Sequence, residues 1–193
     1  MTLHDPVARF QALWDEASRD APFDASACTL ATQGLDDCPN ARVVLLKGVD
    51  PKGYQFFSNY QSCKGEELAR LPQAALCCYW PWTGVQVRVR GGVARLDAAA
   101  SQGYFATRPR GSQLGAWASA QSAPLADRDA LIARLRDVEA RFGAGEVPCP
   151  PHWGGYRLRP EEIEFWFLGD SRLHHREQYR RTDASWSHTL LHP

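Results

Sequence analysis

The order of strand-like and helix-like segments is the feature that most restricts how this chain can fold. From Cys28 to Leu96, β-branched and aromatic residues recur in short runs that are separated by turn signals, which predicts a series of strands. Helical patterns follow from about 98 to 142, and strand-like runs return from about 156 to 191. Strands, a helical insert and further strands predict an α+β domain around an antiparallel barrel or sheet.

The individual elements are predicted from periodicity and from their start and stop signals. Asp5 can cap an opening helix over about 5–19, with Pro6 at its first position. The other expected helices are 64–71, 98–107, 112–120 and 127–142. The expected strands are 42–49, 54–59, 74–79, 85–96, 156–158, 162–168, 172–181 and 186–191.

Composition excludes several classes of function. At 193 residues and zero net charge, the chain suits a single domain and argues against a nucleic-acid or membrane-surface role. The beginning of the chain shows no secretory signal, so a cytoplasmic protein is expected. Its six cysteines are scattered, which predicts reduced thiols and neither a zinc site nor a disulfide framework. Of the adjacent pair Cys77 and Cys78, one is expected to face inward.

Near the C-terminus, Arg172, His174 and Arg176 are spaced two residues apart. On a strand, all three side chains would project from one surface. Such a face is unfavourable in a core and suits an anionic ligand. The alternative is a solvated edge strand.

A second segment joins a helix to a chain break. Tyr104 and Arg108 are four residues apart and should share a helix face, Pro109 and Gly111 then interrupt the chain, and Ser112 can cap the next helix. A phenol, a guanidinium and a capping hydroxyl at a helix N-terminus would form a phosphate site. The alternative is an ordinary corner between two helices.

Further cations flank an apolar strand. Arg42 and Lys47 stand at its two ends, and strict alternation places them on opposite faces. The alternative is a pair of end charges that reach solvent. Lys64, at the start of the short helix, is a cation of the same kind.

No motif supplies reactive chemistry. The chain lacks a dinucleotide fingerprint, a P-loop, a zinc-protease motif and a nucleophile elbow. His174 and His175 would point apart on a strand, so no metal site is expected. Reactive chemistry is therefore expected from an organic cofactor.

Taken together, these segments resemble the pyridoxamine 5′-phosphate oxidases. The segments that carry the resemblance are 42–47 (RVVLLK), 104–112 (YFATRPRGS), 113–122 (QLGAWASAQS), 153–156 (WGGY), 163–166 (IEFW) and 172–174 (RLH). The resemblance covers essentially the whole chain. It implies one FMN-binding split β-barrel domain over 1–193, an antiparallel Greek-key barrel with flanking helices, that works as a homodimer with FMN at the subunit interface.

The resemblance also assigns the site residues. Those expected to bind FMN are Arg42, Val43, Lys47, Phe57, Ser58, Lys64, Gln86, Gln121, Ser122, Trp166 and Arg176. Those expected to bind the substrate are Lys47, Tyr104, Arg108, Ser112, Arg172 and His174, of which Arg172 and His174 would be catalytic and lie over the pyridine ring.

The implied reaction is the oxidation of pyridoxamine or pyridoxine 5′-phosphate to pyridoxal 5′-phosphate in vitamin B6 biosynthesis or salvage. Oxygen is the acceptor, hydrogen peroxide is released, and the amine substrate also gives ammonia. The alternatives are a split-barrel flavin oxidase of another metabolite, such as a phenazine precursor, and a non-catalytic binder of FMN or pyridoxal phosphate.

This sequence departs from the family pattern at four points. Cys63 stands where an arginine is frequent, Val85 stands where an arginine is common, and His175 replaces a frequent aspartate. The chain also begins close to the first helix, without the basic, tyrosine-containing arm that helps to cover the substrate in some relatives. Weaker substrate affinity or turnover is the expected consequence.

Overall fold

The computed structural model describes residues 5–183 and 185–193. The helices are α1 (Pro6–Arg19), α2 (Cys63–Arg70), α3 (Ala98–Ala106), α4 (Arg110–Ala118) and α5 (Arg128–Phe142), with a 3-10 turn η1 (Asp170–Arg172). The strands are β1 (Ala27–Gln33), β2 (Pro39–Asp50), β3 (Gly53–Asn59), β4 (Gln73–Trp80), β5 (Val85–Arg95), β6 (Trp153–Phe167), β7 (His175–Arg181) and β8 (Trp186–Leu191). None of the helices in the described ranges combines the length and apolarity that a membrane crossing requires.

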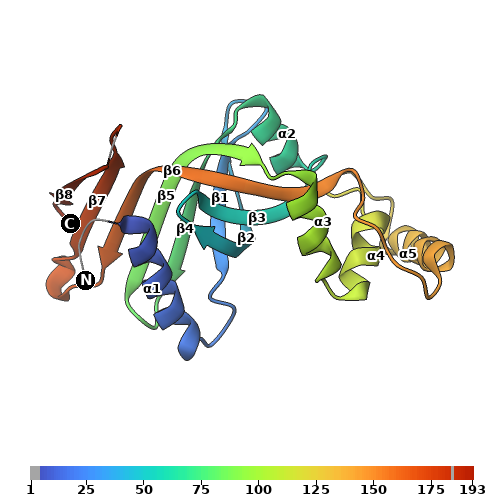
Figure 1. Ribbon diagram of the computed structural model, residues 1–193, viewed down its shortest axis with the longest axis horizontal. Helices are drawn as coiled ribbons and strands as arrows, with labels where there is room; N and C mark the ends of the chain where they lie inside the picture. The colour runs from blue at the N-terminus through green and yellow to red at the C-terminus, as the bar shows by residue number, and fades with distance from the viewer. Residues whose placement is uncertain (1–4, 184) are drawn as a thin grey trace.

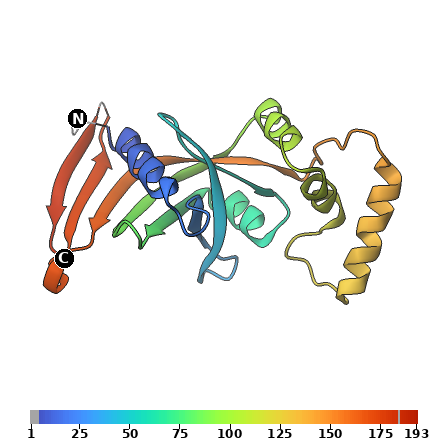
Figure 2. The ribbon, with the colours of Figure 1, turned by 90° about the horizontal axis from the view of Figure 1, so that it is seen from below.

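Six antiparallel strands close into a barrel (Figures 1 and 2). The sheet runs in the order β3-β2-β1-β4-β5-β6, and β3 also pairs with β6, so the two edges of this set meet. Strands β7 and β8 continue the sheet beyond β6. The predicted α+β fold around an antiparallel barrel is confirmed.

Strand β6 is the longest strand and ties the barrel to its extension. Its first half pairs with β3 and its second half with β7. The sequence predicted two shorter strands here, which was wrong. Pro160 lies mid-strand opposite Gly91, and the register shifts just before Gly91, so a bulge carries the strand past the proline. A Cβ on Gly91 would lie 2.0 Å from the carbonyl oxygen of Arg159, so this approach requires glycine.

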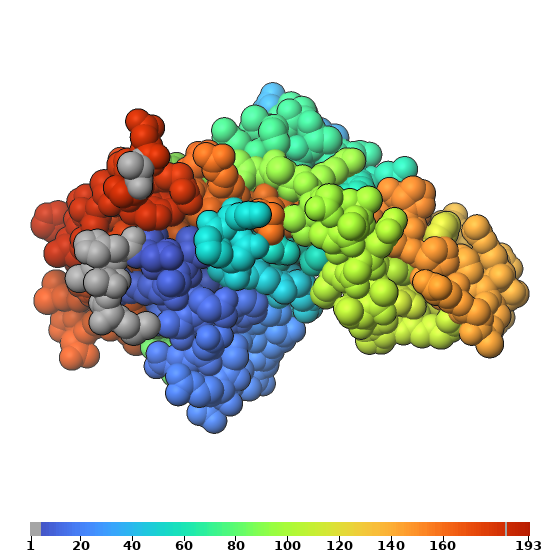
Figure 3. Space-filling view, in the orientation of Figure 1, coloured from blue at the N-terminus to red at the C-terminus, as the bar shows by residue number. Residues whose placement is uncertain are grey.

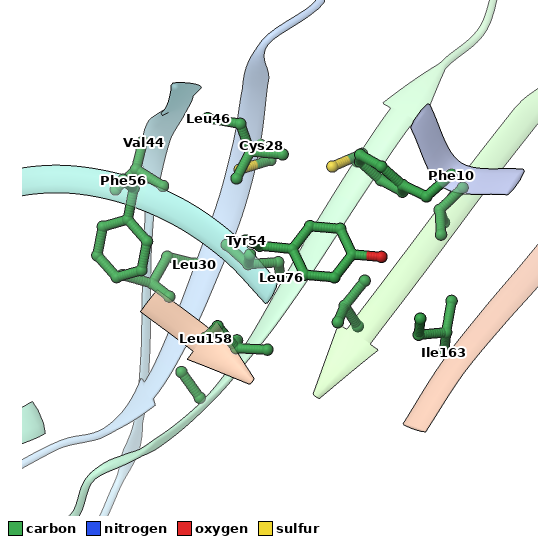
Figure 4. Packing of buried hydrophobic residues seen from close by; sticks show 14 of the residues in the cluster. Phe10, Cys28, Leu30, Val44, Leu46, Tyr54, Phe56, Leu76, Leu158 and Ile163 are labelled. Atoms are coloured by element: carbon green, nitrogen blue, oxygen red, sulfur yellow. The ribbon is translucent and has the colours of Figure 1, made fainter. Parts of the chain in front are cut away.

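Inward-facing side chains fill the barrel with one apolar core (Figure 4). Phe10 of α1 is fully buried in it, and its ring meets that of Tyr54 edge-on at a centroid distance of 4.8 Å. Cys78 is buried in this core while Cys77 is half-buried, which confirms that one member of the pair faces inward.

The helical insert lies at one end of the molecule. Helices α3, α4 and α5 are at one end of the long axis and β7–β8 at the other, with the barrel between them (Figures 1 and 2). A smaller apolar cluster forms under these helices, around Phe105, Leu114, Val147 and Trp153. The helices therefore have a core of their own and can form one wall of a site against the barrel.

Candidate functional site

A cavity of about 640 Å³ opens between β2, β3 and helices α3 and α4. The surface is hollowed between the barrel and these helices (Figure 3). Nine residues that the sequence assigned to a site line this cavity together: Val43, Lys47, Phe57, Ser58, Lys64, Tyr104, Arg108, Ser112 and Gln121. The fold thus brings three cations that are distant in sequence, Lys47, Lys64 and Arg108, to one cavity.

Lys64 forms one cationic group of the cavity wall. Ser62 caps α2, which places Lys64 in its first turn with its side chain buried. The ammonium donates to Ser58 Oγ at 3.1 Å, Ser62 Oγ at 3.0 Å and Gln121 Oε1 at 3.3 Å. Burial, followed by the nearby charge of Arg42, lowers the pKa of Lys64. All three acceptors are neutral, so this buried cation is suited to an anionic ligand.

Arg42 lies behind Lys64 and does not line the cavity. Along β2, Val43 and Lys47 face the cavity while Arg42 faces the other way, so the predicted separation of Arg42 and Lys47 is confirmed. The guanidinium of Arg42 bonds Thr32 and forms an ion pair of 2.7 Å with Glu67. A direct contact between Arg42 and a phosphate stays a prediction.

Sequence reasoning missed the buried carboxylate of Glu67. Besides Arg42, it accepts hydrogen bonds from Thr32 Oγ1 at 2.6 Å, Asn40 Nδ2 at 2.7 Å and Cys63 Sγ at 3.0 Å. Burial raises its pKa, but these donors and the charge of Arg42 outweigh burial and lower the pKa of Glu67 from 4.5 to about 2. Cys63, which replaces a frequent arginine, is therefore part of this network.

We expect Glu67→Gln to lower the free energy of unfolding at pH 7 by about 2–3 kcal/mol, because it removes one partner of a buried ion pair. Since the folded-state pKa of Glu67 is depressed, its contribution is complete above pH 4.5 and is lost as the pH falls toward 2. Urea unfolding at several pH values should therefore show the gap between wild type and variant closing in acid. Exposed Glu66 on the same helix offers the matched control Glu66→Gln, and a gap that is constant with pH would contradict the assignment.

Arg108 forms the second cationic group of the cavity. Its guanidinium packs over the ring of Trp153 at 4.7 Å, and its buried Nη1 has no hydrogen-bond partner among the described residues. Burial lowers the pKa of Arg108 and raises that of Tyr104, one helical turn earlier on α3. A buried guanidinium nitrogen without an acceptor, beside a cavity, is a position for an anionic oxygen.

Ser112 lines the cavity, but it does not cap a helix as predicted. Helix α4 begins at Arg110, two residues earlier, with Pro109 at the N-cap position and no side-chain cap. The fixed φ of proline favours an early start of the helix. Ser112 therefore lies in the first turn of α4, where its amide donates to the carbonyl of Pro109 at 2.8 Å.

Stacked aromatic rings form one wall of the cavity. Phe57 stacks on Tyr104 with 3.9 Å between ring centroids and on Trp153 with 5.5 Å. Trp153 was not predicted to belong to the site, although it is the first residue of the WGGY segment that carries the family resemblance. A Cβ on Gly154 would lie 2.1 Å from the hydroxyl of Tyr60, so the glycine allows β6 to lie close to the ring of Tyr60, which directly follows β3. The cavity also has Asn59, Thr107 and Ser119 in its lining, which were not predicted.

A second cluster of predicted residues lies on the outer face of the sheet. Gln86, Trp166 and Arg176 are directly opposite one another across β5, β6 and β7. The ring of His174 lies against Trp166 with 4.5 Å between centroids. Arg176 forms an ion pair of 2.9 Å with the buried Glu164.

The shared strand face predicted for Arg172, His174 and Arg176 is wrong. Strand β7 begins only at His175, and Arg172 ends the 3-10 turn with a left-handed φ of 65°. Ser171 is also left-handed, with a φ of 52°. The loop between β6 and β7 is therefore a tight turn, and Arg172 and His174 belong to it instead of to the strand.

The structure also shows where two other departures from the family pattern lie, and where the expected FMN-binding residue Ser122 lies. Val85 is buried in the barrel core, and His175 lies 2.8 Å from the carboxylate of Glu177. Ser122 follows Gln121 with a left-handed φ of 71° and is exposed outside the cavity lining.

On one chain, the cavity adjoins α3 and α4 while the β6–β7 loop lies at the opposite end (Figures 1 and 2). The residues that line the cavity and the residues of the β6–β7 loop can therefore contact the same ligand only if two chains form the site.

Comparison with known proteins identifies the family. Residues 15–142 match the family described as "Pyridoxamine 5′-phosphate oxidase", and residues 153–193 match the "Pyridoxine 5′-phosphate oxidase C-terminal dimerisation region". The chain belongs to the pyridoxamine 5′-phosphate oxidase family. The predicted resemblance is confirmed.

Relatives in the pyridoxamine 5′-phosphate oxidase family match this chain over nearly its whole length. A protein of Anaeromyxobacter dehalogenans named pyridoxine/pyridoxamine 5′-phosphate oxidase is 49% identical over 189 residues, which cover 98% of this chain and 96% of that protein. A protein of the same name from Pseudomonas savastanoi pv. phaseolicola is 47% identical, with coverage of 98% and 89%.

Solved structures show the same fold. PhzG from Burkholderia lata, in complex with tetrahydrophenazine-1-carboxylic acid, superposes with a TM-score of 0.92 at 31% identity and covers 98% of this chain and 93% of its own. A pyridoxamine 5′-phosphate oxidase-related, FMN-binding protein from Nostoc punctiforme has a TM-score of 0.78 at 19% identity and covers all of both chains. The fold is therefore the split barrel of the pyridoxamine 5′-phosphate oxidase family, as predicted.

Proposed function

We propose that the protein is an FMN-dependent oxidase that converts pyridoxamine 5′-phosphate and pyridoxine 5′-phosphate to pyridoxal 5′-phosphate. Oxygen is the electron acceptor and becomes hydrogen peroxide. For the amine, water also enters the reaction and ammonia leaves. Curated relatives at 47–49% identity that carry this name support the proposal.

The observation that carries the proposal is that three cations, Lys47, Lys64 and Arg108, line one cavity. Lys64, buried among three neutral oxygen acceptors, is suited to the FMN phosphate. Arg108, with an unpartnered buried Nη1, is suited to the substrate phosphate together with Tyr104 and Ser112. Two phosphate esters, each attached to a flat ring, match this arrangement better than one ligand would.

We propose that a second copy of the chain completes each site. The cavity lining of one chain includes none of Gln86, Trp166, Arg172, His174 and Arg176. The matched dimerisation region, 153–193, contains all of them except Gln86, which lies beside Trp166. In a symmetric homodimer, the β6–β7 loop of each copy would cover the cavity of the other.

In this arrangement the protein acts mainly by positioning. FMN, when bound, supplies the acceptor for the hydride that leaves the C4′ carbon of the substrate and passes the electrons to oxygen. Arg108 anchors the substrate phosphate and the aromatic wall of Phe57 and Trp153 limits the space open to the rings, so the reacting atoms are held in place before reaction. Arg172 would stabilise negative charge on the ring oxygen, and His174 would orient that oxygen.

A phenazine-type substrate is the second candidate, and the match to PhzG favours it. The carboxylate of the acid named in the PhzG complex would also offer an acceptor to the buried Nη1 of Arg108, so this contact does not separate the two candidates. The higher identity of the relatives named pyridoxine/pyridoxamine 5′-phosphate oxidase, 47–49% against 31% for PhzG, favours the phosphorylated substrate.

Purified protein is expected to be yellow and to consume oxygen when pyridoxamine 5′-phosphate is added in air, with equal amounts of pyridoxal 5′-phosphate and hydrogen peroxide formed. Product absorbance and a coupled peroxide assay measure the two products. Unphosphorylated pyridoxamine is the matched control and should react poorly. Bound flavin without peroxide would indicate a carrier, and preference for a phenazine precursor would indicate the second candidate.

A further inference from the structure

The backbone amide of Gly169 determines which nitrogen of His174 can carry a proton. This N–H donates to Nδ1 of His174 at 3.2 Å. A nitrogen that accepts a hydrogen bond has no proton of its own, so the neutral imidazole must carry its proton on Nε2. The bonded geometry therefore corresponds to a single tautomer.

The surrounding loop holds this arrangement in place. The amide of Leu168 donates to the carbonyl of Gly84 at 2.8 Å, and that of Leu173 to the carbonyl of Asp170 at 2.9 Å. A Cβ on Gly169 would lie 2.2 Å from the carbonyl oxygen of Leu173, so no other residue fits without moving the turn. On its other side, the imidazole packs against Trp166, which restricts its rotation.

We propose that Gly169 is a positioning residue that fixes His174 as the Nε2–H tautomer, so that His174 presents a hydrogen-bond donor to an anionic oxygen on the substrate ring. This inference rests on the proposed function, in which the β6–β7 loop covers the substrate bound by the other copy. It assigns the chemistry of the contact: His174 donates a proton in a hydrogen bond and does not remove one. Nε2 already carries its proton, and Nδ1 is occupied by the amide of Gly169.

The neighbouring histidine belongs to a different network. Nε2 of His175 lies 2.8 Å from Glu177, which also holds Arg9 through an ion pair of 2.7 Å and lies 3.1 Å from Nε2 of His188. His174 makes none of these contacts, and its hydrogen bond to Gly169 links it to the turn alone. The two adjacent histidines can therefore be tested separately.

Nitrogen-15 NMR of the FMN-loaded protein, labelled at histidine, tests the tautomer without any turnover. The signals of His174 are assigned by their loss in His174→Gln. At a pH where the ring is neutral, we expect a pyridine-like Nδ1 and a pyrrole-like Nε2. A proton on Nδ1, or rapid exchange between the two tautomers, would overturn the proposal.

Two amide substitutions test the donor role. The side-chain amide of glutamine can place an N–H group near the position of Nε2, whereas that of asparagine reaches only the position of Nδ1. We expect the KM of His174→Asn for pyridoxamine 5′-phosphate to exceed that of His174→Gln by roughly tenfold or more. A base role predicts equal loss in both variants, since neither amide accepts a proton, and that result would reject the proposal. If wild type neither binds FMN nor oxidises the substrate, the proposed function fails, while the same NMR measurement on the protein without FMN still decides the tautomer.

Discussion

Replacing Arg108 with methionine is expected to raise the KM for pyridoxamine 5′-phosphate by roughly 30- to 100-fold, which corresponds to about 2–3 kcal/mol of lost charged hydrogen bonding. The reason is that Arg108 has a buried Nη1 without a partner in the cavity. Methionine keeps a long apolar side chain to pack on Trp153, so the change tests the charge more than the packing. Steady-state kinetics measure the effect, and FMN affinity should change little.

The control for this prediction is a variant of the cation assigned to the FMN phosphate. Lys64→Met removes the cation that Ser58, Ser62 and Gln121 surround, and it should weaken FMN binding by roughly tenfold to a hundredfold. With FMN at saturation, its KM for the substrate should stay near that of wild type. Flavin fluorescence quenching measures FMN affinity in both variants. If both variants weaken both ligands equally, the two cations do not bind separate phosphates.

Local patterns in the sequence were sufficient to predict most strands and helices, because alternation and helical periodicity are local properties. The closure of the barrel was not readable in this way, since Tyr54 pairs with Leu158 across a long separation in sequence. The bulge at Gly91 joins two apparent strands into one, and it depends on contacts across β5 and β6 that no local pattern contains.

In the candidate site, too, local patterns were predictable from the sequence and long-range contacts were not. Tyr104 and Arg108 both line one cavity, although α3 ends at Ala106 and Arg108 lies beyond the helix on which the sequence predicted it. The burial of Glu67 was not predictable, because a glutamate in a short helix is usually exposed and only the fold places Thr32, Asn40 and Arg42 around it. The strand face predicted for Arg172 and His174 was wrong because a tight turn with two left-handed residues replaces the start of the strand.

Heterodimers are expected to recover activity that two variants have each lost. Arg108→Met damages the cavity, and Arg172→Met damages the loop that would cover the cavity of the other copy. In a dimer with one chain of each kind, both changes fall in the same site and the second site is intact. With the substrate well below the wild-type KM, heterodimers isolated with two different affinity tags should therefore show about half of the activity of the wild-type dimer, while each homodimer shows little.

The pair Arg108→Met and Lys64→Met is the matched control, because both residues line the cavity of their own chain. In that heterodimer each site carries one damaging change, so no recovery is expected at low FMN and low substrate. If the Arg108→Met and Arg172→Met heterodimer also fails to recover, then the cavity and the β6–β7 loop do not act across the interface. Arg172 and His174 would then have no route to the cavity, because the β6–β7 loop that contains them lies at the opposite end of the same chain from α3 and α4.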